Sequence, residues 1–154
     1  QPGEYYESIT VDVDKITLIG GDGPLATRPD LDGHGVHSDA VIVSGHDFTM
    51  SNFEVRHFVG NGVVAQETTN FTLKDSKLED TGLYGVYPVR SSFVKVQRVE
   101  VIGARDAGIY VGQSKGIVVE DCVASAAAGA SVEAEAAEVS APAATRARMS
   151  FFMA

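Results

Sequence analysis

The feature that most restricts the fold is a repeat of 23 residues through the middle of the chain. Gly62, Gly85 and Gly108 follow one another at this spacing, and each opens a short apolar run. Three columns of apolar residues keep the same step: Phe48, Phe71, Val94 and Ile117; Met50, Leu73, Val96 and Val119; Val55, Leu78, Val101 and Ala124. Within each unit apolar and polar residues alternate, which is the period of a β-strand. The repeat therefore predicts stacked units of short strands.

One such unit cannot bury its own apolar face. Stacking on similar neighbours at ~4.8 Å per unit would create long parallel sheets around an apolar interior. We therefore predict an all-β fold, a parallel β-helix of about five to six coils of 22–23 residues. We expect residues 1–123 to form the coils, and we expect the whole to be part of a longer stack.

Polar residues recur at one bend of every unit. Asn52, Asp75, Arg98 and Asp121 share the 23-residue step. Asn and Asp tolerate the left-handed backbone conformation that a tight bend requires, although Arg98 departs from that pattern. A row of metal ligands is the alternative interpretation, but the regular spacing favours a ladder of turns.

The first repeat is interrupted by a long polar segment, which we assign to a loop over residues 21–38. The segment and its end carry several potential metal ligands: Asp30, Asp32, His34, His37 and Asp39. Carboxylates suit calcium, and histidines suit transition metals. A solvated loop that covers the edge of the first coil is the interpretation that we prefer over a metal site.

The C-terminal part, residues 124–154, is rich in alanine and differs from the other units. Alanine favours helices intrinsically. However, Gly129 continues the glycine column and Val132 follows it at a strand-like spacing. Neighbouring strands can override propensity, so we predict a divergent terminal coil or cap instead of a helix.

Composition excludes several classes of function. The net charge of −9, with only 12 Lys and Arg, argues against nucleic-acid binding, because phosphate contacts need a basic face. No apolar run is long enough for a transmembrane helix. The single cysteine, Cys122, falls in an inward column, and we interpret it as a buried apolar residue and not as a nucleophile.

Two segments resemble a known family. Gly82-Leu83-Tyr84-Gly85-Val86-Tyr87-Pro88-Val89 and Asp106-Ala107-Gly108-Ile109-Tyr110-Val111-Gly112-Gln113-Ser114 are similar to repeats of the right-handed parallel β-helix, or pectate-lyase-like, superfamily. They resemble above all a subgroup of uncharacterised exported bacterial proteins. The resemblance implies a right-handed coil and an exported location, whether periplasmic, cell-surface or secreted. Members of the superfamily commonly bind or cleave acidic polysaccharides.

The strand that follows each repeated glycine offers a candidate binding face. The predicted ligand-binding residues are Tyr84, Tyr87, Arg90, Asp106, Tyr110 and Gln113. Tyrosine rings can stack on sugars while their hydroxyl groups bind polar partners. A cross-strand aromatic pair that only stabilises the sheet is the alternative. We therefore expect a polysaccharide or oligosaccharide as the partner.

Catalytic candidates are incomplete. Arg90, Arg105 and His46 could act as the base of a lyase or epimerase, with calcium as an ion that such chemistry can use. We expect His46 to be a polar turn residue. The paired carboxylates that glycoside hydrolysis needs are missing from the sequence pattern. A third hypothesis is a non-catalytic scaffold whose loops bind a protein partner.

Overall fold

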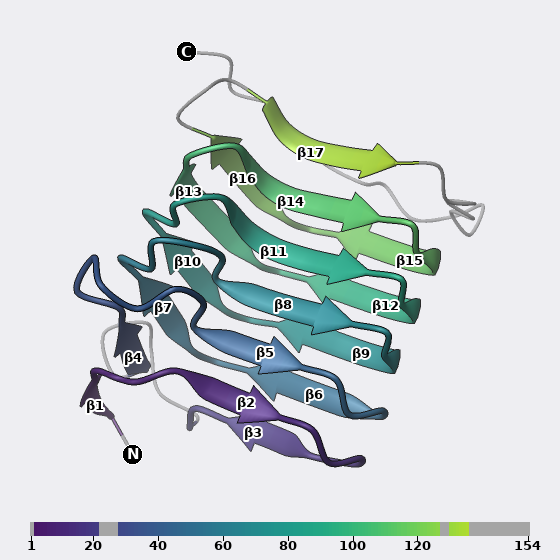
Figure 1. The fold of residues 1–154 in the computed structure, drawn as a ribbon, viewed down its shortest axis with the longest axis horizontal. Helices are drawn as coiled ribbons and strands as arrows, with labels where there is room; N and C mark the ends of the chain where they lie inside the picture. Colours follow the sequence, from purple (N-terminus) through teal and green to yellow (C-terminus); the bar gives the residue numbers. More distant parts are fainter. Residues whose placement is uncertain (1, 22–27, 127–129, 136–154) are drawn as a thin grey trace.

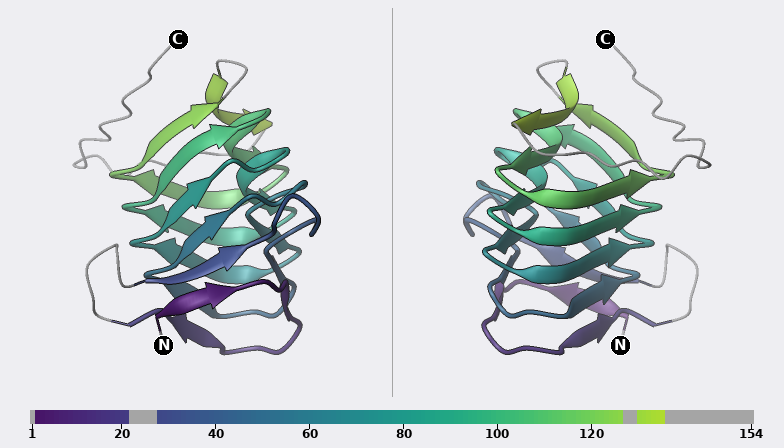
Figure 2. Two further views of the ribbon diagram at one scale, coloured as in Figure 1. Left: turned by 90° about the vertical axis from the view of Figure 1, so that its left-hand side faces the viewer. Right: turned by 90° about the vertical axis from the view of Figure 1, so that its right-hand side faces the viewer.

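Short parallel strands stack into a solenoid in the computed structural model, which describes residues 2–21, 28–126 and 130–135 (Figure 1). The chain passes through three sheets in turn, and each coil of the solenoid contributes one strand to each sheet. Side views show the circuits stacked as layers (Figure 2). The described residues contain no helix, so the all-β prediction is confirmed.

We name the sheets A, B and C. Sheet A consists of β1 (Gly3–Tyr5), β4 (Pro29–Asp32), β7 (Glu54–Arg56), β10 (Lys77–Glu79), β13 (Glu100–Ala104) and β16 (Val123–Ala126). Sheet B consists of β2 (Ile9–Val11), β5 (Val41–Val43), β8 (Val63–Gln66), β11 (Tyr84–Val89), β14 (Ala107–Gly112) and β17 (Ala130–Glu135). Sheet C consists of β3 (Thr17–Ile19), β6 (Phe48–Ser51), β9 (Thr69–Lys74), β12 (Ser92–Gln97) and β15 (Lys115–Glu120).

The predicted apolar columns are single files in the interior. Phe48 pairs in register with Phe71, Phe71 with Val94, and Val94 with Ile117. All four side chains are buried, and the rings of Phe48 and Phe71 stack with centroids 5.7 Å apart. Each file removes apolar surface from water on every coil, which explains why the repeat length is kept so strictly.

The repeated glycines are required by close packing between coils. A Cβ atom on Gly62 would lie 2.5 Å from the carbonyl oxygen of Gly85 and 2.5 Å from Leu78 Cδ2. A Cβ on Gly85 would likewise lie 2.3 Å from Val101 Cγ1. Real Cβ atoms do not approach other atoms this closely, so only glycine fits at these two positions.

The turns from sheet C to sheet A form the predicted ladder. Asn52, Asp75, Arg98 and Asp121 all have positive φ, between 49° and 65°. Arg98 adopts the same conformation as its neighbours, and its guanidinium group binds the Asp75 carboxylate at 2.6 and 3.0 Å. The column is therefore a set of bends, as predicted, and the residue that departs from the pattern forms an ion pair with the coil below.

The assignment of residues 21–38 to one loop is wrong for residues 29–32, which form strand β4. Leu31 is 2% exposed and pairs with Tyr5 on one side and Val55 on the other. Asp30 and Asp32 alternate with Leu31 on the outer side of the strand. The sequence pattern did not reveal this strand, because both of its outward side chains are charged.

Strands continue into the alanine-rich region. β16 pairs with β13, and β17 pairs with β14 in the register Ala107 to Ala130. Residues 123–126 and 130–135 of this region are therefore strands and not parts of a helix. Gly129 and the predicted cap over residues 136–154 lie outside the described residues. Within the described part, no helix has the length and apolar character needed to cross a membrane.

Candidate functional site

Three tyrosines meet on the outer face of sheet B, and we call them the tyrosine cluster. Tyr84 and Tyr87 come from β11, and Tyr110 comes from β14. The ring centroids of Tyr84 and Tyr110 are 4.7 Å apart and the rings are nearly parallel. Tyr87 is tilted against both, with centroids 5.0 Å from Tyr84 and 5.5 Å from Tyr110. All three residues are partly exposed.

The register of the strands produces this cluster. Tyr84 pairs with Ala107 and Val86 with Ile109, so Tyr87 and Tyr110 occupy equivalent outward positions on adjacent coils. Gly112 leaves room for the rings: a Cβ atom there would lie 3.3 Å from Tyr87 Cε2 and 3.5 Å from Tyr110 Cε1. The two rings thus cover a glycine on the sheet surface.

Asp106 joins the cluster through the hydroxyl group of Tyr84. The residue stands in the turn just before β14, and its carboxylate accepts a hydrogen bond from Tyr84. Burial, together with this hydrogen bond and the charge of Asp106, raises the pKa of Tyr84 to about 12. The hydroxyl of Tyr84 is therefore protonated at neutral pH and acts as the donor.

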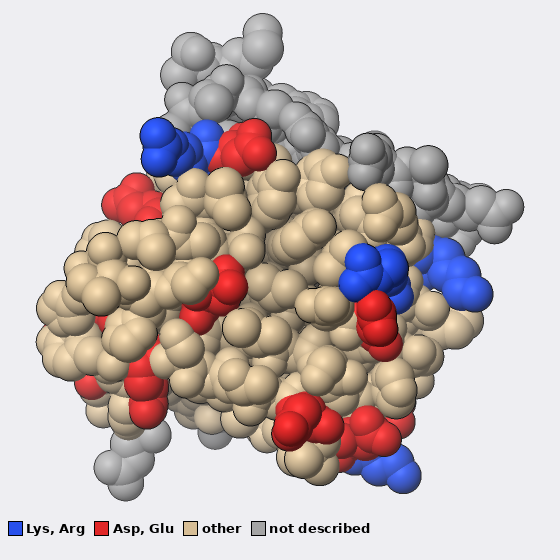
Figure 3. Space-filling view, viewed as in Figure 1, with Lys and Arg blue, Asp and Glu red and all other residues tan. Residues whose placement is uncertain are grey.

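The outer face of sheet B has little charge on the strands β2, β5 and β8 below the tyrosine cluster. Thr10, Ile42 and Val64 stand in register with Tyr87, and none of them is ionisable. The space-filling view shows a largely uncharged surface over this sheet, with charged groups few and mostly near its margins (Figure 3). Such a surface does not repel neutral or weakly polar ligands.

A shallow cleft of about 450 Å³ opens at the turns from sheet A to sheet B. It is lined by Gly35, His57, Phe58, Val59, Asp80, Thr81, Gly82, Gly103 and Arg105. Its polar side chains include His57, Asp80 and Arg105, while Val59, which is half exposed, contributes apolar surface. Because Arg105 immediately precedes Asp106 in the chain, the cleft lies next to the tyrosine cluster.

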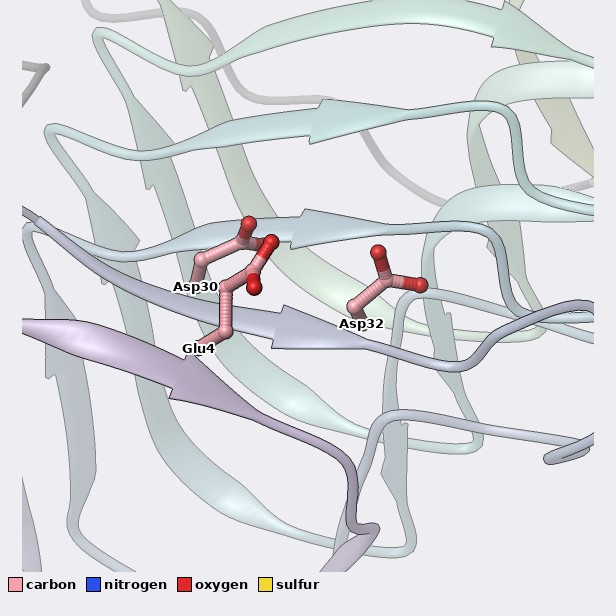
Figure 4. Close-up of side chains that lie close together, drawn as sticks. All are labelled: Glu4, Asp30 and Asp32. Atoms are coloured by element: carbon pink, nitrogen blue, oxygen red, sulfur yellow. The ribbon is translucent and has the colours of Figure 1, made fainter.

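A second group of functional side chains lies on the outer face of sheet A, and we call it the arginine–carboxylate cluster. Arg56 on β7 binds Glu4 on β1 at 2.7 Å and Asp30 on β4 at 2.5 Å through one guanidinium nitrogen. Its Nε lies 3.2 Å from Asp32, close enough for charge attraction, although the atom makes no hydrogen bond. Figure 4 shows the three carboxylates on two neighbouring strands.

Burial affects the two aspartates differently. It raises the pKa of Asp30 to about 6, because it outweighs the attraction of Arg56 and acts together with repulsion from Glu54. Burial also opposes the ionisation of Asp32, but the His34 N–H and the His57 ring bind its carboxylate and hold its pKa below the usual value. Asp32 is therefore the firmly ionised member of the pair.

The expected metal ligands are only partly brought together. Among the described residues, oxygens of Glu4, Asp30 and Asp32 lie within 4.8 Å of one another, which is a donor set that calcium could use. However, the guanidinium group of Arg56 already contacts all three carboxylates and supplies the positive charge. The residues present therefore fit an internal ion pair better than a metal ion.

The two histidines predicted as ligands lie elsewhere. The ring of His34 packs against Tyr6, with centroids 4.1 Å apart, and its backbone N–H binds Asp32. His37 is exposed; its backbone N–H donates to the Gly33 carbonyl, and its own carbonyl accepts a hydrogen bond from the Val59 N–H in the next coil. Sequence reasoning missed the histidine that does meet the acids: His57 Nδ1 lies 3.1 Å from both oxygens of Asp32. Its position 23 residues after His34 was the available signal.

The remaining predicted residues lie in the turns from sheet B to sheet C. Arg90 is paired with Glu67 one coil below, at 2.7 Å, and is not drawn towards the tyrosines. Gln113 occupies the equivalent bend one coil above, with φ of 45°. His46 receives a hydrogen bond from the Thr69 N–H and is a turn residue, as expected.

Burial raises the pKa of the Cys122 thiol, which disfavours the reactive thiolate.

Comparison with known proteins identifies the family. The family model described as the right handed beta helix region matches residues 26–144, most of the chain. Neither the curated proteins nor the solved structures include a match. The family match agrees with the stack of parallel coils and with the resemblance seen in the repeats. The chain therefore belongs to the right-handed β-helix family.

Proposed function

We propose that this β-helix is part of an exported protein and binds an extracellular polysaccharide along the outer face of sheet B. The observation that carries the proposal is the tyrosine cluster, in which three partly exposed rings contact one another beside an open cleft. The exported location is inferred from the resemblance of the repeats to exported bacterial proteins.

The chemistry of the cluster supports a sugar ligand. Each ring offers an apolar surface to the C–H face of a sugar and a hydroxyl group to its polar groups. The bond between Tyr84 and Asp106 holds one of the hydroxyl groups in place before a ligand arrives. Fixing the rings by mutual contact lowers the entropy cost of binding.

The cleft extends this surface. His57, Asp80 and Arg105 provide donors and acceptors at the turns, while the half-exposed Val59 provides apolar contact. Pockets that combine apolar walls with a few polar groups are typical ligand sites. A polymer that lies over the tyrosine cluster could therefore continue into the cleft.

The proposal is tested by affinity electrophoresis of the protein in gels that contain alginate, pectate or a neutral β-glucan. We expect the double variant Tyr87→Ala, Tyr110→Ala to lose the retardation that the wild-type protein shows in at least one gel. Phe93→Ala is the matched control, because Phe93 is a strongly exposed aromatic residue on sheet C, at 62%. Equal retardation of the double variant and the wild type in every gel would exclude the tyrosine cluster as the binding surface.

A lyase or epimerase that acts on uronate polymers is a second candidate. The observation that favours it is the presence of Arg105, one of the candidate bases, in the cleft beside His57 and Asp80. Ultraviolet absorbance of unsaturated products, measured with and without calcium, tests the lyase. Activity that is lost in Arg105→Met would support it, and absence of product from alginate and pectate would count against it.

A further inference from the structure

His57 is held in one orientation by a buried carboxylate. It follows β7 in the turn that leads to sheet B, and its Nδ1 lies 3.1 Å from each oxygen of Asp32. Asp32 is 6% exposed, and it also accepts a hydrogen bond of 2.8 Å from the His34 N–H. The opposite nitrogen of the ring, Nε2, faces Asp80 across the cleft.

These contacts determine which nitrogen carries the hydrogen. An ionised carboxylate only accepts hydrogen bonds, so the His57 Nδ1 that binds Asp32 must be the donor. A neutral imidazole has a single N–H, and Nε2 is therefore left with its lone pair. The distance from Nε2 to the Asp80 oxygen is 3.9 Å, too long for a hydrogen bond.

We propose that Asp32 is a positioning residue that makes His57 Nε2 a hydrogen-bond acceptor for a sugar hydroxyl group in the cleft. The inference rests on the proposed polysaccharide binding and specifies the chemistry of the ligand. Asp80 adds a second acceptor and Arg105 adds donors on the same cleft. Neighbouring hydroxyl groups can each donate and accept, so they match this set. The cleft therefore selects a sugar with free neighbouring hydroxyl groups.

The tautomer can be tested without a ligand. In ¹⁵N NMR spectra of the protein with the His57 ring in its neutral form, we expect the hydrogen of His57 on Nδ1. In Asp32→Asn we expect a mixture of tautomers, because an amide can both donate and accept. A wild-type ring with its hydrogen on Nε2 would overturn the proposal.

Binding is tested with the polysaccharide gel that retards the wild-type protein. We expect His57→Leu to weaken binding about five- to tenfold, because one hydrogen bond is lost and the sugar hydroxyl group is left without its partner. His57→Gln keeps an acceptor oxygen and should lose less than about threefold. His37→Leu is the control, because His37 is an exposed histidine outside the cleft. O-methylation of the polysaccharide should weaken binding to the wild type more than to His57→Leu.

The outcomes separate this inference from the proposed function. If the tyrosine double variant loses binding while His57→Leu binds like the wild type, the role of His57 is excluded and polysaccharide binding stands. If no polysaccharide in the panel retards the wild-type protein, both proposals fail. Circular dichroism of each variant shows whether the coil structure is retained.

Discussion

The arginine–carboxylate cluster and the tyrosine cluster are built in the same way but use their side chains differently. Both consist of outward residues that parallel pairing places over one another on adjacent strands. In the first cluster, Arg56 contacts three carboxylates, so the charged groups largely neutralise one another. In the second, the rings contact one another and remain partly exposed. The comparison favours a structural role for the first cluster and leaves the second with accessible rings, as the proposed binding role requires.

The largest expected effect comes from Arg56→Met. The substitution leaves Asp30 and Asp32 with less compensation in a mostly buried site, and removing one partner of a buried ion pair is costly. We expect the free energy of unfolding to fall by about 3 kcal/mol, measured by urea denaturation. Hydrogen exchange should increase most in β1 and β4. A loss below about 0.5 kcal/mol would contradict a structural role.

A smaller effect is expected from the titration of Asp30. Its pKa of about 6 exceeds the ordinary value of 3.8, so ionisation costs free energy in the folded protein. The stability that Asp30 contributes is therefore fully present below about pH 4 and is lost as the pH rises through about 6. The wild type should lose roughly 2 kcal/mol relative to Asp30→Asn between about pH 4 and 7. If the free energy of unfolding changes with pH in the same way in both proteins, Asp30 is not the cause of the pH dependence.

Tyr110→Ala should change stability less. Tyr110 contacts the rings of Tyr84 and Tyr87, and a surface aromatic pair contributes about 0.5–1.5 kcal/mol. We expect a loss of about 1 kcal/mol in urea denaturation, together with a large loss of polysaccharide binding. A loss of about 3 kcal/mol or more without any change in binding would instead assign the cluster to sheet stabilisation.

The smallest effect is expected from Arg90→Met, which sharpens the contrast between buried and exposed ion pairs. Arg90 binds Glu67 at the surface, where the side chains are 50% and 62% exposed. Water screens such a pair, so the free energy of unfolding should change by less than about 0.5 kcal/mol. An effect as large as that of Arg56→Met would show that the geometry of the coil, and not burial, determines the energy of these pairs.

Most of the regular part of the fold could be predicted from the sequence. The step from Phe71 to Val94 is visible as a repeat, and the left-handed bend at Asp75 follows from the residue type. The contact between Tyr87 and Tyr110 was also predictable, because both stand at the same place in adjacent repeats. Strand β4 was missed, since its inward residue Leu31 lies between two charged residues.

The arginine–carboxylate cluster could not be predicted for a related reason. The cluster does not follow the 23-residue repeat: Glu4 pairs with Asp30 at a step of 26 residues and Asp32 pairs with Arg56 at a step of 24, because the first coil contains an insertion that alters the spacing. The repeat does place His57 one coil after His34, but it does not indicate which of the two rings would bind an acid. His34 and His57 occupy equivalent bends with positive φ, yet the ring of His57 is the one that binds Asp32.

The repeat alone specified the architecture of this protein, because side chains at a constant spacing must stack when coils of equal length are laid over one another. The tertiary structure decided the pairing of charges across the irregular first coil, the protonated nitrogen of His57 and the cleft beside the tyrosines. These features depend on the path of the turns and on burial, and neither is encoded in a local pattern of residues.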